Sequence, residues 1–213
     1  PLLRRYQGVE HLWPSPSYLE REGSSLVYMV DRLIQSAGSG GFYLHDHQKL
    51  VDDMAADPKP KILLGVSYAL WDLAEGLAPK LEDTIVMETG GMKGRREEIS
   101  KQALHKILCR GLGVDKIDSE YGMAELTSQA YSKGENRFYA PPWMRVLVRD
   151  INSPSRLLKC GQRGALNIID LANQDSCAFI STQDVGTLYD DGSFSVEGRI
   201  AKSDIRGCNL LVQ

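Results

Sequence analysis

Residues 61–91 read KILLGVSYALWDLAEGLAPKLEDTIVMETGG, and this stretch decides the fold class. Its first six residues form a short apolar run, which is typical of a buried strand. Apolar residues at helical spacing follow as far as Leu77, and Thr84–Met87 is a second β-rich run. Alternation of strand, helix and strand predicts parallel strands joined by crossover helices. Ligands in such sheets bind beyond the carboxyl ends of the strands, which makes Gly90-Gly91, and Tyr121-Gly122 after a later run, candidate ligand contacts.

The segments on either side extend this pattern. Ser24–Gln35 and His45–Ala56 are predicted helices, the first with a clear apolar stripe and the second more polar. Arg95–Cys109 is predicted to be a further helix. The short run Lys116–Ser119 then predicts a strand that leads into Tyr121-Gly122. We therefore expect an α/β fold in which a parallel sheet carries crossover helices.

The pattern changes after Pro141-Pro142. Short β-rich runs separated by Gly and Asp turns predict an antiparallel β subdomain, with strands at Met144–Val148, Ala165–Ile169, Phe179–Thr182, Gly186–Tyr189 and Ser193–Val196. We place the predicted domains at residues 1–138, an α/β core, and 139–213, the smaller antiparallel β subdomain.

The composition argues against nucleic acid and membranes as partners of this chain. Apolar residues make up 42% of the 213 residues, charged residues 25%, and the formal net charge is −3. This balance gives no electrostatic reason to expect nucleic acid or an anionic membrane as a partner. The longest apolar run, Ile62–Trp71, is about half of the roughly 20 residues that a membrane-spanning helix needs. No export signal is recognisable at the amino end, so we expect a cytoplasmic protein.

The four cysteines, at positions 109, 160, 177 and 208, are far apart in the sequence. No pair has the short spacing of a zinc knuckle or a redox dithiol. We expect reduced thiols, as is usual in the cytosol. A catalytic thiol is a separate question, which depends on what surrounds each cysteine.

One set of short motifs, taken together, indicates a type of reaction. Tyr121-Gly122-Met123-Ala124-Glu125 follows a short strand, and Ser181–Gly186 (STQDVG), Asp191-Gly192 and Gly198-Arg199 come later in the chain. In this order and at these distances the motifs resemble those of the adenylate-forming superfamily, the acyl-CoA synthetases and their relatives. These enzymes join a carboxylic acid to the α-phosphate of ATP and release pyrophosphate.

The resemblance implies a role for each residue of the first motif. Tyr121 would stack on adenine, and Gly122 would let the backbone approach the nucleotide. Met123 and Ala124 would line the nucleotide. Glu125 would help to hold Mg²⁺, a hard cation that prefers oxygen ligands.

The resemblance also assigns residues outside that motif. Thr89, Gly90 and Gly91 would line the adenine side, while Asp184 and Arg199 would contact the ribose. The cofactors that it implies are ATP and Mg²⁺.

A narrower resemblance covers essentially the whole chain. The segments Pro16–Arg21, Ser24–Val30, Gly41–Leu44, Gly90–Arg95 and Ser203–Cys208 are similar to those of the LuxE-like acyl-protein synthetases. Members of that family activate a fatty acid as its adenylate and take the acyl group onto a cysteine near their carboxyl end. Their partner is an acyl-CoA reductase-type protein.

The LuxE-like resemblance implies a nucleophile at Cys208. Lys202 and Arg206 lie near it in the sequence and would favour the thiolate. The implied catalytic residues are therefore Cys208 and Glu125. A buried structural role for Cys208 stays open, as in a phenylacetate-CoA-ligase-like acyl- or aryl-CoA ligase that uses CoA as the acceptor. A non-catalytic nucleotide-binding subunit is the third alternative.

Some features depart from the superfamily pattern. Ala124 stands where a threonine is usual, and the Ser/Thr/Gly-rich phosphate loop and the mobile carboxyl-terminal lid are absent from this sequence. Because the chain also begins at Pro1, we expect it to be part of a longer protein. The basic residues Lys93, Arg95 and Arg96 would either contact polyphosphate or acyl-adenylate, or form a charged helix end balanced by the two glutamates that follow them.

Overall fold

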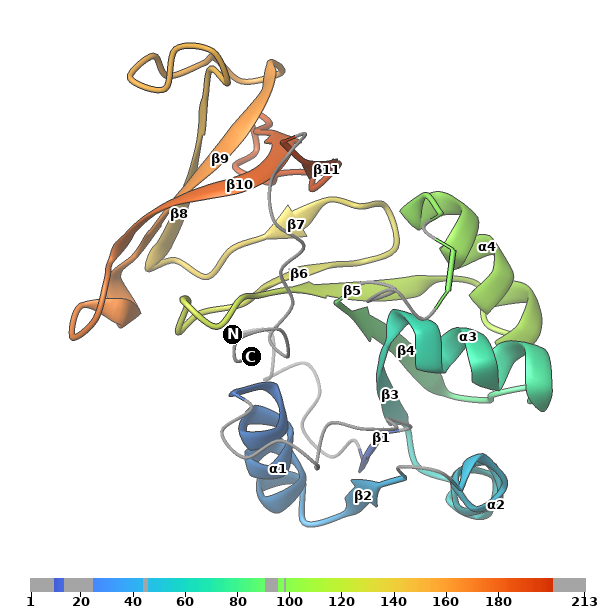
Figure 1. Cartoon of the computed structure of the whole chain (residues 1–213). Coiled ribbons are helices and arrows are strands. Elements are labelled where there is room, and N and C mark those ends of the chain that lie inside the picture. The colour runs from blue at the N-terminus through green and yellow to red at the C-terminus, as the bar shows by residue number, and fades with distance from the viewer. Residues whose placement is uncertain (1–9, 14–24, 44–45, 91–95, 98, 201–213) are drawn as a thin grey trace. The chain divides into compact units, whose positions relative to one another are not determined.

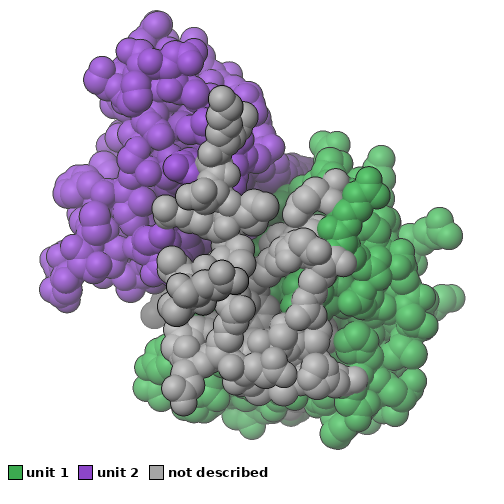
Figure 2. Space-filling model, viewed as in Figure 1, with its two compact units in different colours: residues 1–118, 206–213 green, residues 119–205 purple. Residues whose placement is uncertain are grey.

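The computed structural model describes residues 10–13, 25–43, 46–90, 96–97 and 99–200. The described residues form two compact units, which meet in the sequence between Asp118 and Ser119 (Figure 2). The boundary that we predicted between residues 138 and 139 falls inside the second unit, because two strands before it pair within that unit. No helix among the described residues has both the length and the apolar character needed to cross a membrane.

Unit 1 is built on parallel strands in the order β2-β1-β3-β4 (Figure 1). Its described elements are β1 (Glu10–Trp13), α1 (Ser25–Ala37), β2 (Gly40–Phe42), α2 (His47–Ala56), β3 (Lys61–Val66), α3 (Ser67–Gly76), β4 (Thr84–Thr89) and α4 (Lys101–Leu112). Strands β3 and β4 are parallel and joined through α3, as the sequence predicted. Strands β1 and β2 were not predicted.

The core of unit 1 forms around β3 and α3. Every residue of β3 is buried, and α3 begins at the residue that follows it. Helices α3 and α4 lie side by side (Figure 1). The largest fully buried side chains of this unit come from both helices, from β3, from α2 and from the strand that follows α4: Leu50, Leu63, Leu70, Leu73, Leu108, Leu112 and Ile117.

Helix α4 begins later than predicted. We expected a helix over Arg95–Cys109, whereas α4 runs from Lys101 to Leu112. The hydroxyl of Ser100 accepts a hydrogen bond from the amide of Ala103 (3.2 Å), and this cap fixes the first turn. Gly113 ends the helix in the left-handed conformation, with φ of 69°.

Unit 2 is antiparallel throughout its described residues. The chain enters it within β5 (Ile117–Tyr121), and β6 (Ala130–Ser132) and β7 (Phe138–Tyr139) follow as a meander. A second sheet has the order β11-β10-β9-β8, formed by β8 (Met144–Arg149), β9 (Arg163–Asp170), β10 (Phe179–Thr187) and β11 (Gly198–Arg199). A short 3₁₀ helix, η2 (Leu171–Asn173), follows β9 directly. The predicted α/β fold with an antiparallel β part is therefore observed.

Two details of unit 2 differ from the predicted strands. Phe179–Thr182 and Gly186–Tyr189 were predicted as separate strands, whereas β10 is one strand whose register shifts between Ser181 and Val185. Ser193–Val196 is not a strand. Phe194 instead makes isolated bridges with Phe138 and Leu188, and its fully buried ring lies at the centre of the core of this unit.

Candidate functional site

Tyr121 ends β5 with its ring in the core of unit 2. The residue is 8% exposed, and its ring meets Phe138 and Phe194 edge to face, with centroids 5.9 and 5.6 Å apart. Its hydroxyl donates a hydrogen bond of 2.7 Å to Oδ2 of Asp184. Burial, reinforced by the negative charge of Asp184, raises the pKa of Tyr121 far above its usual value. The phenol is therefore a permanent donor to this carboxylate.

Asp184 is presented by the irregular part of β10. The register of β10 against β9 shifts between Ser181 and Val185. Thr182 fastens this bulge, because its hydroxyl donates to the carbonyl of Leu166 (2.9 Å) and accepts from the amide of Asp184 (3.1 Å). The bulge redirects the strand locally, and the Asp184 side chain reaches Tyr121.

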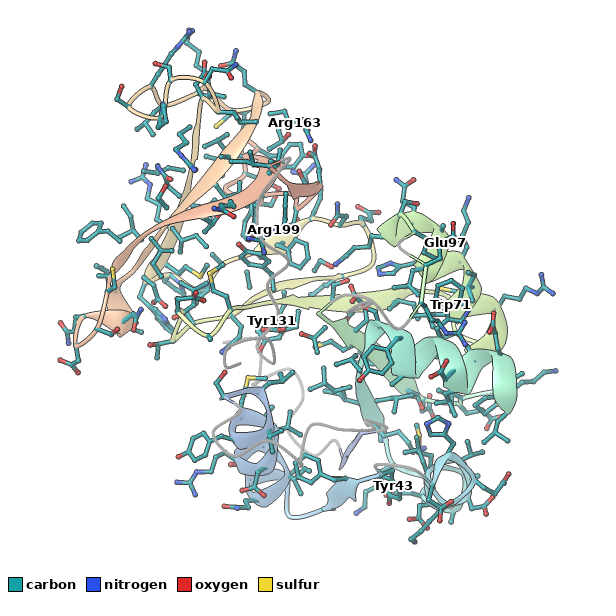
Figure 3. The ribbon with its side chains drawn as sticks, viewed as in Figure 1. Tyr43, Trp71, Glu97, Tyr131, Arg163 and Arg199 are labelled. Carbon is teal, nitrogen blue, oxygen red and sulfur yellow. The ribbon has the colours of Figure 1, made fainter. Side chains whose placement is uncertain are left out.

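Arg199 lies directly opposite Asp184, on the neighbouring strand β11. Its Nε is 3.9 Å from Oδ1 of Asp184, and its Nη2 donates to Oε1 of Gln183 (3.2 Å). Figure 3 labels Arg199 on this strand. The structure thus brings together Tyr121, Asp184 and Arg199, three of the residues that the sequence singled out. The carboxylate between the phenol and the guanidinium has a side chain that is 17% exposed.

Residues 122–126 form a turn after β5. The amide of Leu126 donates to the carbonyl of Met123 (3.1 Å), so Ala124 and Glu125 occupy the two corner positions and are exposed. Met123 and Leu126 pack on the core of unit 2 on either side of them. Gly122 is also exposed, and a Cβ there would require the carboxylate of Glu120, two residues earlier, to shift. The motif therefore presents backbone and the Glu125 side chain at the surface of the unit.

Thr89 and Gly90 lie in unit 1, at the carboxyl end of β4. Thr89 is buried, and Gly90 has φ of 74°, a conformation that favours glycine. The hydroxyl of Ser67 lies 3.1 Å from the carbonyl of Gly90 and 2.9 Å from the carboxylate of Glu88. The predicted site residues Gly91 and Cys208 lie outside the described residues.

A buried acidic residue supports this end of β4 and was not predicted. Glu88 is 1% exposed, and its Oε1 is 2.7 Å from Nζ of Lys101, at the start of α4. Nε2 of His105 is 3.6 Å from the same oxygen. The predicted run ended at Met87, so the sequence did not place Glu88 inside the strand, and its partners come from α3 and α4.

The basic residues after β4 are only partly described. Arg96 bonds to two carboxylates of α3, Asp72 (2.8 Å from Nε) and Glu75 (2.8 Å from Nη1). Its guanidinium also lies 4.6 Å from the ring centre of Trp71, which Figure 3 labels on α3. Arg96 is thus balanced by helix α3. Lys93 and Arg95 lie outside the described residues.

Glu125 is the residue that the resemblance of the motifs assigned to Mg²⁺. Within the described ranges, no group of three or more His, Cys, Asp or Glu side chains is arranged to hold a metal ion. Magnesium commonly uses only one or two carboxylates, together with substrate phosphates and water. An exposed glutamate at the corner of a turn fits that mode of binding.

The chain resembles known proteins in structure and not in overall sequence. No protein-family model matches the chain, and no curated protein matches it in sequence. ATP-bound MatB from Rhodopseudomonas palustris is similar over 93% of this chain and 42% of its own, with a TM-score of 0.68 and 15% identity. The amide bond synthetase McbA from Marinactinospora thermotolerans is similar over 90% and 41%, with a TM-score of 0.64 and 16% identity.

A long-chain-fatty-acid-CoA ligase, FadD1 from Archaeoglobus fulgidus, is similar over 92% of this chain and 45% of its own, with a TM-score of 0.65 and 13% identity. The chain spans less than half the length of each of these three proteins. The likeness establishes the fold, which this chain shares with part of each of these three proteins.

Proposed function

We propose that the protein to which this chain belongs uses ATP to activate a carboxylic acid as its acyl-adenylate. The observation that carries the proposal is the convergence of Tyr121, Asp184 and Arg199 from three strands of unit 2. A partly exposed carboxylate, held by a phenol on one side and facing a guanidinium on the other, is suited to accept hydrogen bonds from ribose hydroxyls. The fold shared with an ATP-bound structure supports the same proposal.

The other residues of the motifs are assigned to different parts of the nucleotide in this proposal. By the resemblance of the motifs, Thr89, Gly90 and Gly91 would line the adenine side, and Gly122 with Met123 and Ala124 would let the backbone approach. The resemblance places Tyr121 against adenine; in the structure the residue is 8% exposed and its ring packs on Phe138 and Phe194.

Glu125 would hold Mg²⁺ in the proposed site, where the ion would neutralise charge on the phosphates of ATP. The carboxyl oxygen of the acid attacks the α-phosphorus, which forms a new O–P bond. The bond from that phosphorus to the bridging oxygen breaks, and pyrophosphate leaves. Holding both reactants in line is the contribution of the protein.

The second half of the proposal concerns the acyl acceptor. The thiolate of Cys208 attacks the acyl carbonyl carbon, a thioester forms, and AMP leaves. This makes the protein an acyl-protein synthetase of the LuxE-like kind, with a fatty acid as substrate and an acyl-CoA reductase-type protein as partner. The support for this half is the resemblance of the motifs.

ATP–pyrophosphate exchange on the full gene product that carries this chain tests the first half. The panel should contain fatty and aryl acids, each with and without CoA. We expect exchange with one acid class, and Asp184→Asn should raise the KM for ATP about tenfold, the equivalent of about 1.4 kcal/mol. Asp150→Asn is the matched control, because Asp150 caps a turn of unit 2 through backbone amides. Exchange with no acid, despite binding of ATP, would favour a non-catalytic nucleotide-binding subunit.

Labelling with a radioactive acid tests the second half. We expect stable acyl labelling of the wild-type protein and none of Cys208→Ser, with exchange unchanged. Turnover that needs CoA and survives the Cys208→Ser substitution would instead identify an acyl- or aryl-CoA ligase.

A further inference from the structure

The turn that carries Glu125 is held by residues far away in the sequence. Asp170, the last residue of β9, is fully buried. Its Oδ2 accepts from the backbone amides of Thr127 (3.2 Å) and Ser128 (2.8 Å), and its Oδ1 accepts from the hydroxyl of Ser128 (2.8 Å). The amide of Ala172 donates to the same Oδ1 at 3.1 Å. The carboxylate is thus bonded at both oxygens, as a buried charge requires.

Asn173, in η2, holds the turn on its other side. It is 8% exposed, and its Nδ2 donates to the carbonyls of Glu125 (2.7 Å) and Cys177 (2.8 Å). Its Oδ1 accepts from the hydroxyl of Thr127 (2.9 Å). Two donors and one acceptor used in this way fix the orientation of the amide.

Trp143 extends the network to the surface. Its Nε1 donates to the hydroxyl of Ser128 at 2.8 Å, while the same hydroxyl donates to Asp170. Its carbonyl accepts from the amide of Leu171 at 3.0 Å. The chain of hydrogen bonds is therefore continuous from Trp143 through Ser128 to Asp170, and linked bonds strengthen one another.

These contacts act on the peptide groups next to Glu125. Its own carbonyl is bonded to Asn173, and the amides two and three residues further on are bonded to Asp170. The side chain of Glu125 itself is exposed. Fixing the backbone on this side of a corner residue fixes the direction in which its Cα–Cβ bond points.

We propose that Asp170 and Asn173 are positioning residues that aim the carboxylate of Glu125 at the metal of a magnesium–nucleotide complex. The inference rests on the proposed function and deepens it. It assigns the β9–η2 corner, which contains none of the nucleotide-binding motifs, to the metal side of the site. Loss of a partner that orients a metal ligand typically weakens metal binding about 10- to 100-fold.

The first test is Asn173→Ala in the full gene product. We expect the Mg²⁺ concentration at half-maximal ATP–pyrophosphate exchange to rise about tenfold, while the dissociation constant for AMP without metal is unchanged. Asn136→Gly is the matched control, since Asn136 also donates from Nδ2 to a backbone carbonyl, of Val196 (3.1 Å), and has positive φ that glycine tolerates. A rise equal to that of the control, or an equal weakening of AMP binding, would overturn the inference.

The second test separates positioning from general stability. In a Glu125→Gln background, Asn173→Ala should have no further effect on the Mg²⁺ requirement, because the ligand that it orients is gone. Additive effects would contradict the inference. If Asn173→Ala does not fold, Ser128→Ala replaces it, which leaves both backbone amides bonded to Asp170 and should raise the requirement less, about threefold. No rise with this variant would also overturn it.

A third measurement distinguishes failure of the inference from failure of the proposed function. If wild-type protein shows Mg²⁺-dependent exchange whose Mg²⁺ requirement Glu125→Gln raises, and Asn173→Ala behaves as its control does, only the inference fails. If wild-type protein shows no exchange and no Mg²⁺-dependent binding of ATP, the proposed function fails first and the inference falls with it. Hydrogen exchange at the Thr127 and Ser128 amides, faster in Asn173→Ala, would report whether the anchor itself exists.

Discussion

Replacing Tyr121 with phenylalanine removes a single hydroxyl from the centre of the candidate site. That hydroxyl donates at 2.7 Å to Asp184, whose side chain is 17% exposed. A hydrogen bond to a charged group contributes about 1.5–3 kcal/mol. Because Asp184 keeps some contact with solvent and faces Arg199, we expect the lower end, so Tyr121→Phe should reduce the free energy of unfolding of unit 2 by about 1.5 kcal/mol at neutral pH.

The same substitution has a pH dependence whose sign follows from the structure. Burial and the charge of Asp184 raise the pKa of Tyr121 above its usual value of 10.0. Above that pH the unfolded chain releases the phenolic proton and the native protein keeps it, so stability is lost as pH rises, by about 1.4 kcal/mol per pH unit. Phenylalanine cannot ionise. The stability curves of wild type and variant should therefore converge above about pH 10 and cross near about pH 11.

Urea unfolding at a series of pH values, followed by circular dichroism, measures both effects. Tyr139→Phe is the control, because Tyr139 lies in the same unit and is 44% exposed. A Tyr121→Phe variant as stable as this control at neutral pH would show that the bond to Asp184 is not formed. A stability difference that stays constant up to about pH 11 would refute the argument from the pKa.

Three further substitutions test other parts of the structure. Phe194→Ala should lower the free energy of unfolding by about 3–5 kcal/mol in urea titrations, because its ring is fully buried in the core of unit 2. Arg96→Gln should cost only about 1 kcal/mol, since its carboxylate partners are exposed, and it should shift the fluorescence of Trp71. Burial acts to raise the pKa of Glu197, but hydrogen bonds, the strongest from Ser195, lower it overall. The ionised Glu197 therefore stabilises the fold above the usual pKa of a glutamate, and this stabilisation is lost as pH falls. Glu197→Gln should flatten the acid limb of the stability curve below about pH 5, measured by thermal unfolding.

Elements with strong local signals were predictable from the sequence. Strand β3 has the predicted bounds, Lys61–Val66, because an uninterrupted apolar run is buried on both faces. Helix α4 was misplaced at its start because Arg95–Ile99 fits the helical pattern as well as the residues after it do. What decides the start is the Ser100 cap together with the contacts of Arg96 on α3, and the second of these is not local.

The candidate site was predictable only in part. Tyr121, Asp184 and Arg199 were found because each belongs to a short motif that resembles those of a known superfamily. Asp170 and Asn173 were not found, because the groups that they bond in the turn lie 42 to 48 residues away in the sequence. A polar residue that is satisfied only by tertiary contacts leaves no periodic pattern, so no spacing rule reveals it.

The two breaks in regular structure at this site share a physical cause. Where β10 bulges, Arg149 is 9% exposed and its Nη2 donates at 2.8 Å to the carbonyl of Thr182, and burial lowers the pKa of Arg149. Where the chain turns after β5, Asp170 is fully buried on the amides of the turn. In a regular β-ladder, neighbouring strands would bond the carbonyl of Thr182 and the amides of Thr127 and Ser128. The bulge that carries Asp184 and the turn that carries Glu125 would then not exist. Burying a charge is costly unless it is bonded, so each buried side chain replaces the ladder bonds that a regular strand would have made. The irregular backbone and the buried charges are therefore one feature, and it is what separates this site from an ordinary β-sheet edge.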